Sequence, residues 1–142
     1  MPQLITIAVI ICILLGMLRL TATINGWREL VKQYKFTGRS DVNRRLVLRY
    51  GLKYASNPLA TITFGLFLIV GANEAGVYIG HGLFRWVGYS PIWVPWTDVK
   101  VIEIAPRKQW LFLSFAKVPL VNVELPNYEV RDLFATRISN TE

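Results

Sequence analysis

Residues 4–18 read LITIAVIICILLGML, and none of these side chains is charged. Continued to Ile24, the stretch has 21 residues, and as an α-helix it rises about 30 Å, close to the thickness of a bilayer's hydrocarbon core. Arg19 lies five residues before that end, so its long side chain can reach the lipid headgroups. The sequence therefore predicts a transmembrane helix over residues 1–24.

Two other interpretations of this stretch stay open at the level of sequence. A cleaved signal peptide also begins with a short apolar run, but it needs positive charge before the run and small residues after it. Here Met1, Pro2 and Gln3 precede the run without side-chain charge, and the basic residues follow it. A buried helix of a soluble protein is the third interpretation, and we favour the retained membrane helix over both.

The net charge of +7 is concentrated after the apolar stretch. Residues 1–58 hold nine Lys and Arg against two acids, whereas residues 59–142 hold seven of each. Lys and Arg next to a membrane helix favour the cytoplasmic side. We therefore expect a single-pass protein of the inner (cytoplasmic) membrane, with its N-terminus outside and the remaining chain in the cytoplasm.

The composition of the 142-residue chain restricts its class further. Hydrophobic residues make up 53% and charged residues 18%, which excludes intrinsic disorder, and the length corresponds to one domain. The single cysteine, Cys12, excludes an internal disulfide framework. Because His81 is the only histidine and Cys12 lies in the apolar stretch, we expect no catalytic residues, no metal site and no cofactor.

Residues 25–43 have the pattern of a short amphipathic helix followed by a linker. Trp27, Leu30, Val31 and Tyr34 recur with helical spacing on one face, and mostly charged residues occupy the other. Because Trp and Tyr favour the membrane–water interface, this face contacts either lipid headgroups or the domain that follows. The spacing is compatible with both possibilities.

Residues 44–142 are predicted to form a mainly antiparallel β-barrel or sandwich, which makes the fold class a membrane-anchored α+β protein. Apolar residues alternate with mostly basic ones over residues 45–54, which predicts one strand with a basic outer face. Residues 62–72 are rich in β-branched and aromatic types, so we expect a buried strand, with a second, short membrane segment as the alternative. Further strands are expected at residues 77–79, 92–93, 99–104, 110–115 and 121–125, and a C-terminal amphipathic helix at residues 126–139.

Two short motifs add a resemblance to this pattern. The string Gly-Val-Tyr-Ile occupies residues 76–79, and Val-Pro-Trp-Thr-Asp-Val occupies residues 94–99. In its order of elements over residues 44–138 the chain resembles bacterial pleckstrin-homology-like (PH-like) domains. With the string GWRELVKQYKF at residues 26–36 it is also similar to a group of small bacterial membrane proteins. The resemblance implies a scaffold that binds lipids, peptides or neighbouring subunits and performs no catalysis.

Two groups of residues are candidate binding sites for a partner. Basic residues near the membrane contact anionic headgroups or an acidic protein, or serve only as a topology signal. Nucleic acid is not expected, because Tyr50 and Tyr54 lie on the strand face opposite the arginines. The aromatic residues between 83 and 96 form either a docking surface or part of the core. The candidate site residues are Arg39, Arg44, Arg45, Arg49 and Lys53 from the basic stretch, and the tryptophans Trp27, Trp86, Trp93 and Trp96.

These features favour a non-enzymatic, membrane-anchored interaction module. We expect an accessory subunit that docks onto a larger membrane protein complex or onto anionic membrane lipid. The alternative is a component of a membrane enzyme or transporter whose active groups come from a partner chain and lie near His81 or Arg85. A secreted β-protein whose leader has been removed is a third possibility.

Overall fold

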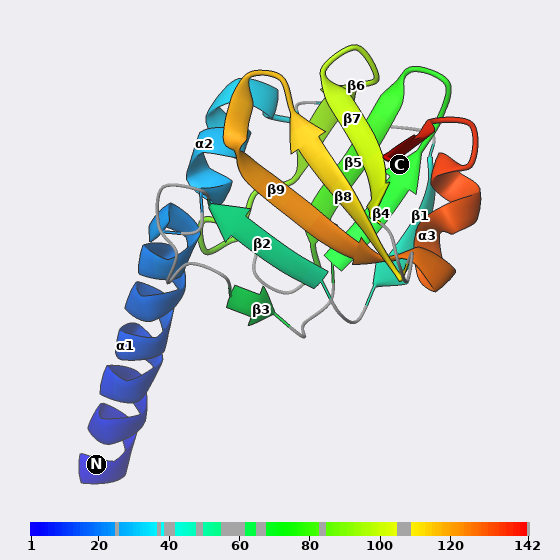
Figure 1. The fold of residues 1–142 in the computed structure, drawn as a ribbon. Coiled ribbons are helices and arrows are strands. Elements are labelled where there is room, and N and C mark those ends of the chain that lie inside the picture. The colour runs from blue at the N-terminus through cyan, green and yellow to red at the C-terminus, as the bar shows by residue number, and fades with distance from the viewer. Residues whose placement is uncertain are drawn as a thin grey trace.

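The computed structural model places a long N-terminal helix beside an α+β domain (Figure 1). It describes residues 1–24, 26–36, 38, 42–47, 50–54, 62–64, 68–82, 85–104 and 109–141. The helices are α1 (Pro2–Ile24), α2 (Trp27–Tyr34) and α3 (Asn127–Phe134). The strands are β1 (Asn43–Val47), β2 (Tyr50–Tyr54), β3 (Ile62–Phe64), β4 (Leu68–Ala72), β5 (Gly76–His81), β6 (Ile92–Pro95), β7 (Val99–Ile104), β8 (Trp110–Phe115), β9 (Val118–Pro126) and β10 (Ile138–Thr141).

Helix α1 is long and apolar enough to cross a membrane. Within Pro2–Thr23, an 18-residue segment reaches a mean hydropathy of 2.5, and this segment is not buried inside the protein. Large side chains such as Leu4, Ile7 and Leu20 are more than half exposed. Figure 1 shows α1 projecting from the domain, with only its C-terminal end close to it. A continuous apolar surface of this kind is unusual on a soluble monomer and marks a surface that contacts lipid or another protein.

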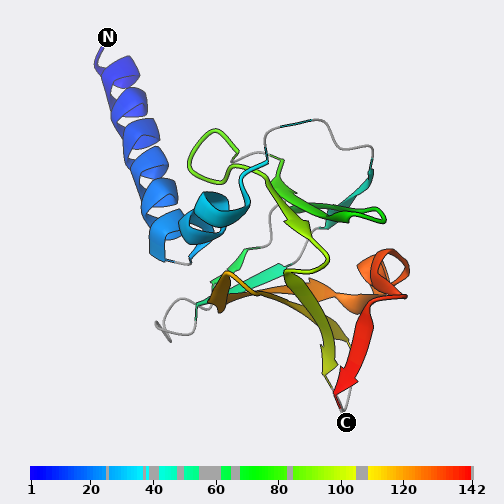
Figure 2. The same ribbon diagram turned by 90° about the horizontal axis from the view of Figure 1, so that it is seen from above.

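The domain contains two β-sheets. One has four strands in the order β1-β4-β5-β6, and the other has six strands in the order β10-β7-β8-β9-β2-β3. The described strand pairs are antiparallel except that β10 runs parallel to β7, with Ile138 opposite Val101. Apolar side chains from both sheets form one core. Helix α2 packs on β6 and β9, and α3 packs on β4, β8 and β9, so the two short helices cover different sides of the domain (Figures 1 and 2).

The single strand expected over residues 45–54 is instead two strands in different sheets. β1 pairs with β4, whereas β2 pairs with β3 and β9. Alternating side chains are compatible with one long strand or two short ones, and the partner strands decide between them. Residues 62–72 divide in the same way, because β3 and β4 belong to different sheets. The second membrane segment considered for these residues is wrong, since β4 is hydrogen-bonded between β1 and β5.

The other predicted elements lie close to those in the structure. β7 and β8 have the expected bounds, and β5, β6 and β9 contain the shorter strands predicted there. The turn before β5 forms because the side-chain oxygen of Asn73 accepts hydrogen bonds from the backbone amides of Ala75 and Gly76, at 2.8 and 3.1 Å. The C-terminal helix is shorter than predicted, because α3 ends at Phe134 and Ile138 begins β10.

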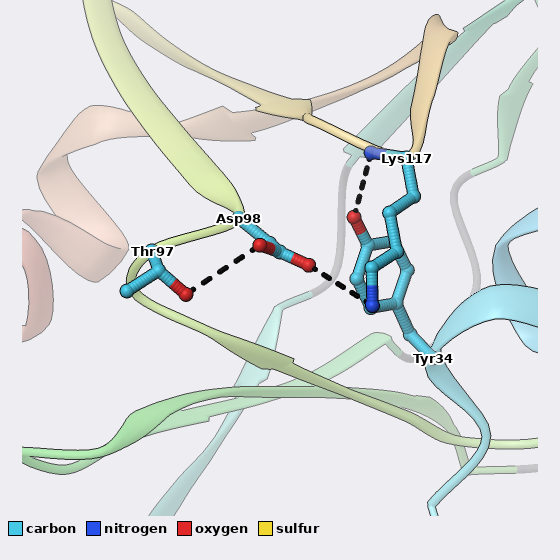
Figure 3. Close-up of polar contacts among 4 residues, drawn as sticks. All are labelled: Tyr34, Thr97, Asp98 and Lys117. Atoms are coloured by element: carbon cyan, nitrogen blue, oxygen red, sulfur yellow. Dashed lines mark hydrogen bonds and ion pairs between the residues drawn. The ribbon is translucent and has the colours of Figure 1, made fainter.

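Helix α2 is fixed to the domain through the turn between β8 and β9 (Figure 3). The backbone N–H of Lys117 donates to the hydroxyl oxygen of Tyr34 at 2.9 Å, and the Lys117 ammonium lies 3.4 Å from a carboxylate oxygen of Asp98. Burial raises the pKa of the Tyr34 hydroxyl, which therefore stays protonated at neutral pH. Trp27 and Leu30, on the same apolar face of α2, are completely buried. This face of α2 thus packs on the domain and not on lipid.

Candidate functional site at the end of helix α1

A cluster of aromatic side chains joins the C-terminal end of α1 to the domain. The ring of His81, at the end of β5, packs edge-on against Trp27 with 4.8 Å between the centroids and lies 4.4 Å from the ring of Tyr89. The indole N–H of Trp27 donates to the carbonyl oxygen of Ser90 at 3.1 Å. The hydroxyl groups of Tyr89 and Thr21, a residue of α1, form a hydrogen bond of 3.1 Å. Helices α1 and α2, strand β5 and the segment before β6 therefore meet at one junction.

His81 is a structural member of this junction. Its side chain is only 3% exposed, and burial lowers its pKa from 6.5 to about 3. The imidazole is therefore neutral at physiological pH and does not exchange a proton there. Among the described residues, no group of three His, Cys, Asp or Glu side chains is placed to hold a metal ion. The described side chains of the junction therefore hold α1 and the domain together by packing.

Residues 85–90 form a loop that lies beside the last turns of α1 (Figure 2). Gly88 in this loop has a φ of +95°, which side chains other than glycine rarely adopt. A Cβ atom at this position would lie 3.6 Å from the Cβ atom of Ala22 and 3.9 Å from the Cγ atom of Arg19. Ala22 is accordingly buried, although most of α1 is exposed. The close approach places the loop at the level of the helix end.

A cavity of about 410 Å³ opens between α1, α2 and this loop, and we name it the α1–α2 cavity. Arg19 from α1 and Arg28 from α2 both line it. Thr23 and Ser90 add hydroxyl groups, and no acidic residue is among its described lining residues. A volume of this size falls within the range of small-ligand sites. The end of the apolar helix therefore carries a concave, cationic site.

The same loop carries an exposed aromatic residue. Trp86 is 78% exposed, whereas the other four tryptophans are buried or half-buried. The guanidinium carbon of Arg85 lies 4.6 Å from the ring centroid of Trp86, at cation–π distance. An exposed Trp with a neighbouring Arg is typical of surfaces that contact a membrane interface or another protein.

The basic candidates from the sequence do not form one strand face. Arg44 is exposed on β1, and its guanidinium carbon lies 4.6 Å from the ring centroid of Tyr78 on β5. Arg45 and Lys53 belong to β1 and β2, which lie in different sheets, and their side chains fall outside what the structure describes. The remaining basic candidates, Arg39 and Arg49, lie outside the described residues.

The four tryptophan candidates also differ in how exposed their side chains are. Trp27, predicted to contact lipid or a partner, is completely buried, so this prediction is wrong and its ring belongs to the core. Trp93 is half-buried on β6. Trp96 donates its indole N–H to the carbonyl oxygen of Asn73 at 2.7 Å and packs edge-on against Phe134 of α3. Of the four candidates, Trp86 alone is exposed and belongs to the loop beside α1.

The cavity itself could not be predicted from the sequence. Arg19 is identifiable from sequence as a residue that reaches the headgroups, but nothing in the sequence joins it to Arg28 or to the loop that contains Gly88. The usable signal is that both arginines lie near the end of the apolar stretch, nine positions apart in the sequence. Their convergence depends on the turn between α1 and α2 and on the packing of a distant loop.

The comparisons with known proteins add no family to these observations. No protein-family model matches the chain, and no curated protein matches it. The likeness to PH-like domains therefore rests on residues 76–79 and 94–99 and on the order of elements. The first motif lies on β5, and the second runs from the end of β6 to the start of β7. The two meet where β5 pairs with β6, with Gly76 opposite Pro95 and Val77 opposite Val94.

Proposed function

We propose that the protein is a non-enzymatic, single-pass membrane protein whose PH-like β domain lies against the anionic cytoplasmic face of the membrane. One observation carries the proposal. The exposed pair of Arg85 and Trp86 and the cationic α1–α2 cavity belong to the same end of an unburied apolar helix. With α1 across a bilayer, this end lies at headgroup level, because Arg19 is the first charged residue after residues 4–18.

The side chains at this end suit that environment. Tryptophan is enriched at the membrane–water interface, where its apolar ring and its N–H group both find partners. A basic residue near an anionic leaflet gains about 1 kcal/mol, and Arg19, Arg28 and Arg85 contribute at the same end of the helix. Because α1 tethers the domain to the bilayer, these contacts act at a high effective concentration. Modest individual contacts therefore suffice to hold the domain at the surface.

In this proposal the domain is an interaction module and an accessory subunit of a larger membrane protein complex. Lipid contact at the end of α1 orients the domain, and faces farther from α1 are left for the complex. Arg44, which is exposed on β1, is available to an acidic partner. No catalytic role is assigned to His81, since it is buried and neutral.

Quenching of tryptophan fluorescence tests the lipid contact. The full-length protein is placed in nanodiscs whose lipids carry a quencher near the headgroup end of the acyl chains. We expect the wild-type protein to lose a larger fraction of its fluorescence than Trp86→Phe, because the exposed indole lies at this depth. Trp96→Phe is the matched control, since Trp96 packs on α3 at the side of the domain away from α1 (Figures 1 and 2).

The lipid composition supplies a second readout. Adding phosphatidylglycerol to phosphatidylcholine discs should increase the quenching of Trp86, because anionic lipid attracts the arginines around it. Equal quenching of the wild-type protein and Trp86→Phe in both mixtures would contradict the proposal, since it would place the loop in water. If Trp86 is unquenched but Trp86→Ala abolishes co-purification of a membrane protein, the surface binds protein and the lipid contact is wrong.

A further inference from the structure

The α1–α2 cavity is lined by two arginines that belong to different helices. We propose that this cavity binds the phosphate group of an anionic phospholipid, with Arg19 and Arg28 as its two ligands. The inference rests on the proposed function, which puts the cavity at headgroup depth. It adds a defined lipid site to a general contact between the domain and the membrane surface.

Arginine has the chemistry that this role requires. A guanidinium group donates two parallel hydrogen bonds to phosphate oxygens, in addition to its charge. Within the described part of the chain, neither Arg19 nor Arg28 takes part in a salt bridge that would neutralise it. Glu29, the acid next to Arg28 in the sequence, is paired with Lys32 at 2.9 Å on the surface of α2. The described lining of the cavity therefore carries two positive charges and no negative one.

The remaining lining matches the boundary between a headgroup and its acyl chains. Ala22 and Val31 supply apolar surface, and Thr23 and Ser90 supply hydroxyl groups. The hydroxyl of Thr23 already donates to the carbonyl oxygen of Arg19 at 3.2 Å, so its free lone pairs can accept a hydrogen bond. Such an acceptor suits a lipid hydroxyl group. A site with this lining distinguishes a glycerol-bearing headgroup from a bare anion.

The position of the cavity along α1 favours a lipid phosphate over a soluble one. Arg19 follows the uncharged stretch directly, and the helix continues for five more residues to Ile24, at about 1.5 Å each. The cavity opens along these last turns, between Arg19 and the start of α2. Leaflet phosphates are the abundant anions at this depth of a membrane.

Native mass spectrometry of the full-length protein in detergent micelles tests this site. The micelles are titrated with dioleoyl phosphatidylglycerol or with dioleoyl phosphatidylcholine, and the retained lipid is counted. We expect one phosphatidylglycerol to be retained in preference to phosphatidylcholine. The double variant Arg19→Gln/Arg28→Gln should lose at least about tenfold in affinity for phosphatidylglycerol, because two phosphate ligands are removed.

The charge-matched control is Lys100→Gln/Arg137→Gln. It also removes two positive charges, but from exposed positions on β7 and after α3 that do not line the cavity. It should bind phosphatidylglycerol as the wild-type protein does. Circular dichroism verifies that each variant is folded. If the double variant fails to fold, the single variant Arg28→Gln replaces it, because Arg28 occupies an exposed position of α2.

Three results would overturn the inference. One is wild-type affinity for phosphatidylglycerol in the cavity variant, and another is equal retention of the two lipids by the wild-type protein. The third is displacement of phosphatidylglycerol by inorganic phosphate, which would assign the cavity to a free anion. Failure here is separable from failure of the proposed function. If Trp86 is still quenched in nanodiscs in the variant Arg19→Gln/Arg28→Gln, the membrane contact of the domain stands. If Trp86 is not quenched in the wild-type protein, the membrane contact itself is wrong.

Discussion

The hydroxyl oxygens of Thr21 and Tyr89 lie 3.1 Å apart, although the two residues are 68 positions apart in the sequence. Thr21 lies near the end of α1, and Tyr89 lies in the loop before β6. The ring of Tyr89 also packs on His81 and Trp27 in the core of the domain. This junction therefore sets the orientation of the domain relative to α1, and hence relative to the membrane that we propose α1 spans.

The substitution Tyr89→Phe is expected to loosen this orientation while the domain stays folded. It removes a hydrogen bond of about 1 kcal/mol but keeps an aromatic ring against His81 and Trp27. Spin labels on Cys12 of α1 and on a cysteine introduced by Tyr128→Cys in α3 report the distance between helix and domain. In nanodiscs, the distance distribution of Tyr89→Phe should be broader than that of the labelled parent.

Thr6→Ala is the matched control for this measurement. It also removes a hydroxyl group from α1, but this hydroxyl donates only to the carbonyl oxygen of Pro2, at 3.0 Å within the helix. The control should leave the distance distribution unchanged. An unchanged distribution in Tyr89→Phe would show that ring packing alone orients the domain, contrary to our expectation.

The stability of the domain is expected to fall in mild acid because of His81. Its pKa is about 3 in the folded protein against 6.5 in an unfolded chain, so the unfolded state binds the proton first as the pH falls. This contribution to stability is complete above pH 6.5 and is lost progressively toward pH 3. Between pH 7.5 and pH 5.5 the free energy of unfolding should drop by about 1 kcal/mol, measured by urea titration in detergent.

The matched variant for this prediction is His81→Phe, which keeps a ring between Trp27 and Tyr89 but cannot titrate. Because His81 is the only histidine of the chain, the decrease between these two pH values should largely disappear in the variant. A decrease of equal size in both proteins would mean that other groups cause the acid sensitivity.

The strand positions with clear alternation could be predicted from the sequence. In β9, Val121, Val123 and Leu125 are buried and the polar residues between them are half-buried, which is the period of two that the sequence displays. Prolines and polar residues at the strand ends marked the bounds of β7 and β8 well. Local rules suffice there because each strand pairs with its neighbour in the sequence.

Local rules did not suffice where the chain changes sheets. Residues 45–54 alternate over their whole length, yet β1 pairs with β4 while β2 pairs with β9, where Lys53 lies opposite Asn122. The alternation defines which side chains share a face, but it contains no information about the partner strand. The division of this stretch is therefore a result of long-range pairing.

The candidate site was predictable only in its chemical character. Basic and aromatic residues after the predicted membrane helix led us to expect a membrane-facing surface, and Trp86, which is exposed in the structure, was one of them. The buried position of Trp27 and the convergence of Arg19 with Arg28 depend on how α2 packs on the domain. The approach of Gly88 to Ala22 likewise joins segments that are distant in the sequence.

Tyr34→Phe is expected to destabilise the domain by about 1 kcal/mol, because it leaves the partly buried N–H of Lys117 without its acceptor (Figure 3). Hydrogen exchange of the Lys117 amide should become faster in the variant. Lys117→Ala is the control, since it keeps this hydrogen bond. It removes a partly exposed ion pair with Asp98 and a cation–π contact with the Tyr34 ring at 5.5 Å, and both contribute little at such a position. Equal exchange rates in Tyr34→Phe and the wild-type protein would contradict the assigned role of the hydroxyl.

The orientation of the protein in the membrane is the last prediction, and the single native cysteine makes it testable. In a Cys12→Ser background, Tyr128→Cys places a thiol on α3, where the native side chain is 80% exposed, and Gln3→Cys places one at the start of α1. A membrane-impermeant maleimide should label position 3 in intact spheroplasts of a bacterial expression host, and position 128 only after permeabilisation. The physical reason is that the net charge of +7 lies after the apolar stretch, and such charge is retained on the cytoplasmic side. Labelling of position 128 in intact spheroplasts would reverse the topology and would remove the anionic inner leaflet as the surface that the arginines contact.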